Sequence, residues 1–380
     1  PFQKNGSAVS LPPLSSVSIT SYRSLRAVHM PVGALNVFIG RNGTGKTNLY
    51  RALSLLQQAA LGRITRAIAE EGGVESVLWA GERKRGAPVR LSLKARLGDL
   101  SYAIEIGLPN KVTDAALPLE PLVKEESLAI ASGGRDIVLM QRSGPSVWLR
   151  AAGGERLTYD NEVLGSETAL FAFRDGGRFP ELDIVRRTLS DWRFYHGFRT
   201  DDGSPLRRPA LALTTPTLSS DGSDLAAVFA TLAEVRADTI DLDAAIDDAF
   251  PGARLAVAVD AGQAAISMRF PDLSRSFEAR ELSDGTLNFL ALAGALLAYR
   301  LPAFVALNEP EASLHPDLLE PLARIVARAC ERSQIWIVTH SATFAQALAR
   351  EAGAVPRTIV KTDGATEIEG LKVTGEFAEE

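Results

Sequence analysis

The sequence feature that most constrains the fold is the motif G-x-x-x-x-G-K-T at residues 40–47. An apolar run at residues 35–39 precedes it, and a helical pattern over residues 48–60 follows it. This order of strand, glycine loop and helix is the context in which the motif forms a phosphate-binding loop. The motif therefore predicts an α/β fold in which the loop follows the carboxyl end of a β-strand.

Each residue type in this motif suits the binding of a triphosphate. Gly43 and Gly45 let the backbone curl so that successive N–H groups point at an anion. The N-terminus of the following helix adds a positive potential at the same place. Lys46 is expected to reach the β- and γ-phosphates, and the Thr47 hydroxyl to bind Mg²⁺. The expected ATP-binding set is completed by the neighbouring residues Arg41, Asn42, Thr44 and Asn48.

The composition bounds the class of protein. A chain of 380 residues with 46% hydrophobic residues can bury one large α/β domain or two smaller ones. The net charge of −5 gives no global signal for nucleic acid. A single cysteine, Cys330, excludes an intramolecular disulfide, and the longest apolar run, 289–299, is about half the length of a membrane span. We expect a soluble cytoplasmic protein without membrane insertion.

Two further apolar runs end in polar residues. Residues 303–307 lead into Asn308 and Glu309, and residues 334–338 lead into Thr339 and His340. Because ligands bind outside the carboxyl ends of strands in an open α/β sheet, these ends should converge on one nucleotide. Glu309 is expected to orient and deprotonate the attacking water. Glu311, beyond a proline, is the competing choice for this base.

His340 and Asn308 have less specific expected roles. His340 is expected to donate a hydrogen bond to the γ-phosphate, although a surface histidine at a strand end is the simpler alternative. Asn308 stands where an aspartate that binds Mg²⁺ is usual. The amide keeps an oxygen ligand but loses the charge, and hard cations prefer charged oxygens. We therefore expect weaker Mg²⁺ binding or slow turnover, with nucleotide binding retained.

A second anion site is predicted at residues 281–286, which read E-L-S-D-G-T before a long apolar helix. Ser283, Asp284 and Gly285 stand at the N-terminus of that helix, where backbone N–H groups attract anions. Since one loop already serves the nucleotide of this chain, the second site suggests contact with a γ-phosphate held by another subunit. A plain helix cap by Ser283 or Asp284 is the alternative, and both can hold together.

The chain divides into five predicted parts. Residues 1–14 are expected to form a tail, and residues 15–84 the first part of the nucleotide-binding core. Alternating hairpin patterns such as 89–96 and 101–106 predict an antiparallel β subdomain over residues 85–160. Residues 161–280 are expected to form a helical and hairpin lobe, with a long loop at 199–217 and a helix at 225–248. Residues 281–380 alternate helix and strand and complete the core.

Taken in order, these motifs resemble the head of an ATP-binding-cassette (ABC) ATPase. The chain looks like the soluble branch that includes RecF, the structural-maintenance-of-chromosomes (SMC) heads and the overcoming-lysogenization-defect ATPases, and it is most similar to stand-alone bacterial ATPases of this type. The resemblance implies a P-loop NTPase fold of ABC-ATPase type, with a mixed sheet core, an antiparallel β subdomain and a helical signature lobe.

The resemblance also implies a homodimer that sandwiches two ATP molecules with Mg²⁺. The phosphate loop of one chain would face the signature residues 283–285 of the other, and Ser313, Leu314 and His315 would form the D-loop at that interface. Arg23 matches a strand turn near the nucleotide in such heads. The family's glutamine loop has no clear counterpart here, so one γ-phosphate or Mg²⁺ contact is unassigned.

Several biological roles are compatible with such a head. Residues 21–96 carry 13 Lys or Arg and 4 Asp or Glu. This basic stretch could contact nucleic-acid phosphates in DNA maintenance, repair or phage defence, together with Arg186, Arg187, Arg193, Arg199, Arg207 and Arg208. A regulatory ATPase that gates a separate effector protein is the alternative. A transporter subunit is less favoured because the helix after Asp284 lacks the usual Gln/Arg-rich start. A GTPase is disfavoured because no N-K-x-D motif is present.

Overall fold

The computed structural model describes residues 11–82, 90–109 and 117–378. The chain forms two compact units that interleave along the sequence. The first unit comprises Asn42–Trp192 with the described parts of Pro1–Gly33 and Ile359–Glu380, and the second comprises Ala34–Arg41 and Arg193–Thr358. The five-part division expected from the sequence remains a prediction. No helix in the described ranges is long and apolar enough to cross a membrane.

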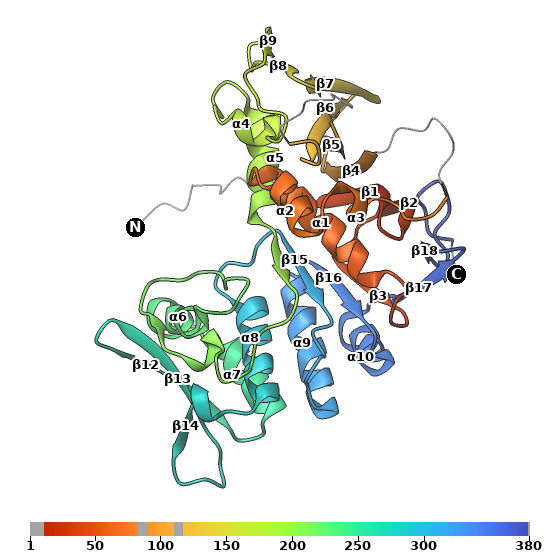
Figure 1. Cartoon of the computed structure of the whole chain (residues 1–380). Helices are drawn as coiled ribbons and strands as arrows, with labels where there is room; N and C mark the ends of the chain where they lie inside the picture. Colours follow the sequence, from red (N-terminus) through yellow and green to blue (C-terminus); the bar gives the residue numbers. More distant parts are fainter. Residues whose placement is uncertain (1–10, 83–89, 110–116, 379–380) are drawn as a thin grey trace. The chain divides into compact units, whose positions relative to one another are not determined.

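An eight-stranded antiparallel sheet dominates the first unit (Figure 1). Its strand order is β2-β1-β4-β5-β6-β7-β8-β9, and the bounds are β1 Leu14–Tyr22, β2 Leu25–Pro31, β4 Arg90–Leu97, β5 Leu100–Gly107, β6 Leu122–Ser132, β7 Arg135–Ser143, β8 Ser146–Arg150 and β9 Arg156–Asp160. Burial alternates along β4, as expected when only one face packs against a core. The predicted antiparallel subdomain is confirmed, and the sheet also includes β1 and β2.

Helices of the first unit pack beside this sheet. They are α1 Lys46–Ala60, α2 Ile64–Glu70, α3 Val74–Val77, α4 Ala169–Ala172 and α5 Pro180–Asp191. α1 contacts β1, β4 and α5, and α5 contacts β5. The apolar side of α1, which includes Leu49, Leu53 and Leu56, is buried. This burial anchors the helix that follows the phosphate loop.

A buried polar network fixes α4 to the sheet. Glu126 on β6 accepts hydrogen bonds from the Tyr102 hydroxyl at 2.9 Å and from two backbone N–H groups at the start of α4, at 2.6 and 2.9 Å. Arg142 on β7 lies 3.9 Å from the Glu126 carboxylate and donates to three backbone carbonyls, including that of Leu164 at 2.8 Å. Both side chains are fully buried, and burial raises the pKa of the Glu126 carboxyl. A buried pair of this kind is costly to break by removing one partner.

A parallel sheet forms the centre of the second unit. Its order is β10-β15-β16-β3-β17, with bounds β3 Leu35–Ile39, β10 Arg193–Tyr195, β15 Phe304–Asn308, β16 Gln334–Thr339 and β17 Arg357–Thr362. β15 is buried along its whole length, as expected for a strand covered on both faces. The first two residues of β17 pair with β3, and its remainder pairs in the first unit with β18, Ala365–Ile368.

Three helices accompany the parallel sheet: α8 Asp284–Leu297, α9 Leu319–Cys330 and α10 Ala342–Ala352. α8 is buried on all sides from Thr286 to Leu297, because it lies in the middle of the apolar core of this unit. A short 3₁₀ turn, Pro316–Leu318, precedes α9. The core therefore holds α8 firmly and leaves only its N-terminal residues at the surface.

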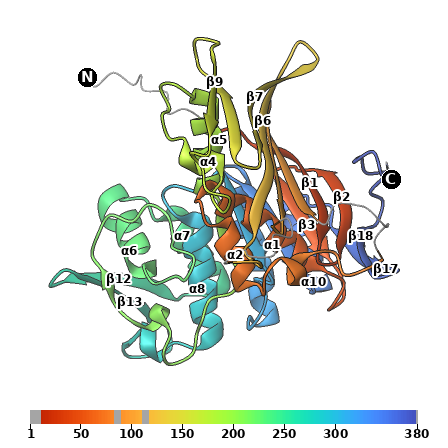
Figure 2. The ribbon, with the colours of Figure 1, turned by 45° about the horizontal axis from the view of Figure 1, so that its top comes forward.

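A lobe of the second unit contains a small antiparallel sheet with α6 Leu225–Ala230 and α7 Ile240–Ala249 (Figure 2). The sheet is formed by β11 Ala210–Leu211, β12 Arg254–Asp260, β13 Gln263–Arg269 and β14 Ser276–Glu278. The expectation of one helix over residues 225–248 was wrong. A π-helical turn, Thr231–Arg236, follows α6, and Ala237, with φ 50°, ends it in the left-handed region.

Candidate nucleotide-binding site

The phosphate loop has the glycine geometry that its motif predicts. Gly43 and Gly45 have φ of 81° and 97°, and α1 begins at Lys46, whose side chain is buried. A Cβ at position 45 would lie 1.9 Å from Thr366 Oγ1 and 2.4 Å from Ser24 Oγ. Glycine is therefore required at this position both by its backbone conformation and by the close approach of two side chains.

Those two side chains belong to a hydrogen-bond chain that holds the loop. The Thr366 hydroxyl, on β18, donates to the Thr44 carbonyl at 2.7 Å. Ser24 Oγ lies 2.6 Å from Thr366 Oγ1, and the Asn48 side-chain amide donates to Ser24 Oγ at 2.7 Å. The side chain of Asn48, which was expected to contact ATP, thus belongs to the hydrogen-bond chain that stabilises the phosphate loop within the first unit. No sequence pattern indicated a role for Thr366, which lies 322 positions from Thr44.

Arg23 is engaged by a carboxylate of its own unit. Its Nε and Nη2 atoms donate to Glu71 Oε2 at 3.1 and 2.6 Å, and the Tyr22 hydroxyl donates to the same oxygen at 2.9 Å. Burial, together with the Glu71 carboxylate, raises the pKa of Tyr22. Arg23 has φ 50°, so a strained turn carries it. A contact between Arg23 and the nucleotide stays a prediction.

In the second unit, parallel strands bring the other predicted residues to one edge. β10, β15, β16 and β3 are adjacent and run in the same direction, so their carboxyl ends lie side by side. Glu309 follows β15, has φ 50°, and its N–H donates to the Val338 carbonyl of β16 at 2.7 Å. Its side chain is 32% exposed. The left-handed turn at Glu309 takes the chain out of the strand while the carboxylate stays accessible.

Glu311, the other candidate base, differs from Glu309 in its environment. It is buried, and its Oε1 atom accepts hydrogen bonds from the Thr339 hydroxyl, from His340 N at 3.1 Å and from Ser341 N at 3.3 Å. Glu311 therefore holds the turn after β16. His340 Nδ1 lies 3.6 Å from Glu309 Oε1 and 3.4 Å from Glu311 Oε1. This geometry brings Glu309 and His340 together and gives Glu311 a positioning role.

Asn308 offers an oxygen that fits a hard cation or its bound water. The residue is buried, and its Oδ1 atom has no hydrogen-bond partner among the described residues. A buried acceptor without a partner is costly unless something else satisfies it. Mg²⁺ takes oxygen ligands and usually keeps several waters. Within the second unit, the Asn308 amide oxygen is therefore an atom that could serve Mg²⁺ or a water bound to it.

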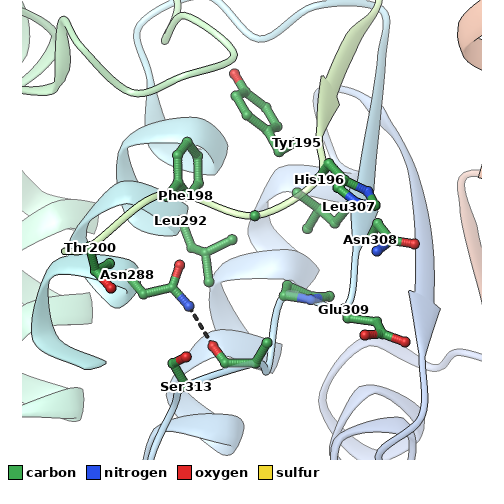
Figure 3. A pocket seen from close by; sticks show the side chains of 13 residues that line it. Tyr195, His196, Phe198, Thr200, Asn288, Leu292, Leu307, Asn308, Glu309 and Ser313 are labelled. Atoms are coloured by element: carbon green, nitrogen blue, oxygen red, sulfur yellow. Dashed lines mark hydrogen bonds between the residues drawn. The ribbon is translucent and has the colours of Figure 1, made fainter. Parts of the chain in front are cut away.

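A cavity of about 180 Å³ lies beside Glu309, between the ends of β10 and β15 and the helix α8 (Figure 3). His196 lines it immediately after β10. Because Tyr195 pairs with Leu307, the next residues, His196 and Asn308, stand at the same level on neighbouring strands. The pattern of residues 193–198 by itself indicates only a strand or an extended segment, and it does not single out His196. A polar residue after a short aromatic strand was the signal that could have identified His196.

The predicted second anion site lies at the start of α8. Ser283 caps the helix, with its hydroxyl accepting from Thr286 N at 3.2 Å, and Ser283 and Asp284 are exposed. A Cβ at Gly285 would lie 3.0 Å from the Ser313 carbonyl oxygen. The Asn288 amide of α8 donates to the Ala312 carbonyl at 2.7 Å (Figure 3). The helix start and the segment after Glu309 are thus held together.

The predicted D-loop shares a surface with this helix start. Ser313, with φ 65°, Leu314 and His315 line a depression of about 660 Å³ together with Ser283 and Gly285. The His315 ring accepts a hydrogen bond from Asp317 N at 3.4 Å and so begins the 3₁₀ turn before α9. The two motifs that the sequence assigned to a dimer interface therefore form one continuous patch of the second unit.

A comparison with protein-family models decides the family. The model described as "AAA domain, putative AbiEii toxin, Type IV TA system" matches residues 35–119 and 161–345, which together are more than half of the chain. The chain belongs to this family. The unmatched residues 120–160 coincide with β6 to β9, so these strands extend the sheet beyond the family's common part. None of the curated proteins matches the sequence.

Solved structures with a similar fold are SMC head domains. An SMC head in complex with the C-terminal winged-helix domain of ScpA aligns with a TM-score of 0.51 and 12% identity, over 96% of this chain and 99% of that chain. The SMC head of Thermotoga maritima aligns with a TM-score of 0.44 and 16% identity, over 95% and 100%. That of Pyrococcus furiosus aligns with a TM-score of 0.49 and 12% identity, over 94% and 96%.

The family match and the first of these alignments confirm the resemblance and the fold class expected from the sequence. The AAA-family chain has an ABC-type ATPase fold like that of SMC heads, with a parallel sheet and an antiparallel sheet. At such low identity the alignment concerns the fold alone. Function must be argued from the site residues themselves.

Proposed function

We propose that this protein binds and hydrolyses ATP as an ABC-type ATPase and that ATP closes a homodimer. The observation that carries the proposal is the convergence of parallel strands in the second unit. β15 delivers Glu309, β16 delivers His340, and β3, the neighbour of β16, leads into the phosphate loop. Ligands of open α/β sheets bind at such an edge.

Each residue has a chemical task in this proposal. Lys46 and the loop amides bind the β- and γ-phosphates. The exposed Glu309 carboxylate orients a water and takes its proton, and His340 donates a hydrogen bond to a γ-phosphate oxygen. Mg²⁺, held by Thr47 and Asn308, would neutralise phosphate charge. Because Asn308 is uncharged, we expect weak Mg²⁺ binding and slow turnover.

The dimer is proposed from the patch at the start of α8. Ser283 and Gly285 stand at the N-terminus of a fourteen-residue helix, where Ser283 is exposed and Gly285 is half-buried. A helix N-terminus favours an anion, and in the ABC arrangement that anion is the γ-phosphate bound by the second chain. Hydrolysis would then remove the charge that holds the two chains together and open the dimer.

Sedimentation and phosphate release test this function. Glu309→Gln with ATP and Mg²⁺ should sediment as a dimer and release little phosphate. Lys46→Ala should stay a monomer, because it cannot hold the triphosphate. Ser283→Arg serves as the matched control, since it should bind ATP and still fail to dimerise. A Glu309→Gln protein that remains a monomer at saturating ATP would refute the sandwich.

For the biological role, we propose a switch that acts in DNA maintenance, repair or phage defence. Several arginines suggested as DNA contacts form ion pairs, namely Arg90 with Glu105, Arg96 with Asp136, Arg186 and Arg187 with Asp183, and Arg199 with Asp201. These pairs reduce the positive charge available to DNA. Binding to DNA should therefore be measured with and without ATP over a range of salt concentrations.

A second candidate role is the gating of a separate effector protein. The family description names a putative toxin of a toxin–antitoxin system, and the paired arginines favour a protein partner over DNA. ATP-dependent DNA binding that weakens with salt would favour the first role. A stoichiometric complex with one effector, released on hydrolysis and insensitive to DNA, would favour the second.

A further inference from the structure

One arginine of the long loop after β10 is tied to the start of α8. Arg207 ends the 3₁₀ turn Pro205–Arg207, and its side chain is only 11% exposed. Its Nη1 atom donates to the carbonyls of Arg280 and Leu282 at 3.0 and 2.9 Å, and its Nη2 atom donates to Asp284 Oδ1 at 2.7 Å. The planar guanidinium thus bonds the chain on the N-terminal side of Ser283 and the first residue of the helix.

The other side of the guanidinium is hydrogen-bonded to a residue that lines the cavity beside Glu309. Arg207 Nε donates to the Thr200 carbonyl at 2.8 Å, and Thr200 lines that cavity together with His196 and Glu309. One side chain therefore connects the start of α8 to the wall of the cavity near the predicted base. A lysine could not make these four bonds, because only arginine presents a planar fork of donors.

The charge of Arg207 matters as much as its geometry. Asp284 is exposed and lies between Ser283 and Gly285, the two residues expected to meet a γ-phosphate. An uncompensated carboxylate at that position would repel the triphosphate, and the repulsion would grow as water is excluded. The ion pair with Arg207 offsets this charge and leaves the backbone N–H groups of the helix free to attract the anion.

We propose that Arg207 is a positioning residue of the signature motif and acts on the nucleotide bound by the other chain. It holds the backbone at residues 280–284 and neutralises Asp284, so that Ser283 and Gly285 can receive the γ-phosphate. This inference rests on the proposed ATP-sandwiched dimer. It assigns a task to an arginine for which the sequence suggested only a contact with nucleic-acid phosphates.

Mixing experiments test the proposal, because a signature residue and a phosphate-loop residue serve different sites of the same dimer. Lys46→Ala and Arg207→Met are each expected to lose activity when alone, with kcat for Arg207→Met lowered about 10- to 100-fold, as for lost hydrogen bonds to charged groups. Mixed dimers keep one intact site, formed by Lys46 of one chain and Arg207 of the other. A 1:1 mixture should recover up to half of wild-type activity, since Lys46→Ala forms no dimer of its own and each mixed dimer has one working site of two.

Lys46→Ala mixed with Ser283→Arg is the control pair, and it should recover to the same extent. If the control pair recovers and the Arg207 pair does not, Arg207 does not act on the partner's nucleotide and the inference is wrong. If neither pair recovers, the sandwiched dimer itself is refuted. Arg207→Met should also bind ATP as tightly as wild type, because its own phosphate loop is untouched.

Arg207→Lys is the control for the case in which Arg207→Met does not fold. It keeps the positive charge and the aliphatic stem but loses the fork, so it should fold and show the same recovery with a smaller initial loss. A folded Arg207→Lys protein with wild-type kcat, together with an unfolded Arg207→Met protein, would reduce Arg207 to a stabilising residue and overturn the proposal.

Discussion

Replacing Thr366 by valine should weaken nucleotide binding without unfolding the protein. The Thr366 side chain is buried, and its hydroxyl donates to the Thr44 carbonyl and is bonded to Ser24. Valine has nearly the same shape, so the change removes two hydrogen bonds and leaves the packing in place. Each such bond contributes about 1 kcal/mol net. Their loss lets the loop leave its binding conformation before ATP arrives.

The expected loss in ATP affinity follows from the two hydrogen bonds that the substitution removes. If both hydrogen bonds of Thr366 keep the phosphate loop in its binding conformation, their loss weakens the binding of ATP by about 1–2 kcal/mol. This corresponds to roughly a 5- to 30-fold rise in the Kd for ATP. Titration of an ATP analogue into Thr366→Val by calorimetry measures the change. Thr366→Ser is the matched control, because it keeps the hydroxyl and removes only a methyl group.

Two results would refute this reasoning. Thr366→Val could bind ATP with wild-type affinity, in which case the hydrogen bonds to the loop do not prepare it for the ligand. Alternatively, Thr366→Ser could lose as much affinity as Thr366→Val, and then the methyl contact rather than the hydroxyl would matter. Thermal unfolding of both variants checks that any loss of binding is not a loss of folded protein.

Three further predictions, tested with five variants, concern the second unit and the buried network of Glu126 and Arg142. Glu309→Gln should lower kcat about 100-fold or more with KM almost unchanged. Glu311→Gln keeps an acceptor oxygen and should retain most of the activity. A larger loss of kcat in Glu311→Gln than in Glu309→Gln would reverse the roles of the two residues. Asn308→Asp should lower the Mg²⁺ concentration needed for half-maximal hydrolysis, and an unchanged Mg²⁺ dependence would contradict its assignment. Arg142→Met should destabilise the first unit by about 3–5 kcal/mol in urea unfolding, and Glu126→Gln in the same chain should recover part of that loss by removing the buried charge.

The sequence predicted those parts of the fold that depend on local patterns. The strands of 35–39, 304–308 and 334–339 are short apolar runs, and the structure has them within one residue of the expected bounds. The antiparallel strands after residue 85 were visible because alternation with period two and glycine turns recur there. The phosphate loop was recognisable because its residue types and spacing follow directly from anion binding.

Contacts between distant segments could not be predicted in this way. Thr366 is an ordinary strand residue in the sequence, and only the pairing of β18 brings its hydroxyl to the phosphate loop. Arg207 stood in a stretch interpreted as a polar, proline-rich loop, and its four hydrogen bonds arise from the tertiary fold. The interrupted helix at 231–237 was missed because helical periodicity does not distinguish a π-turn from an α-turn.

The interleaving of the two units has a consequence for how the protein is made. β3 pairs with β16, and Leu35 lies opposite Ile335, so the centre of the parallel sheet joins residues 300 positions apart. During synthesis β3 cannot pair with β16 until most of the chain has left the ribosome. The unpaired apolar strand can aggregate during this time. No single cut between residues 42 and 357 leaves either unit with all of its segments. Dissection of this protein into halves should therefore fail, and co-expressed fragments should be soluble only when both are present.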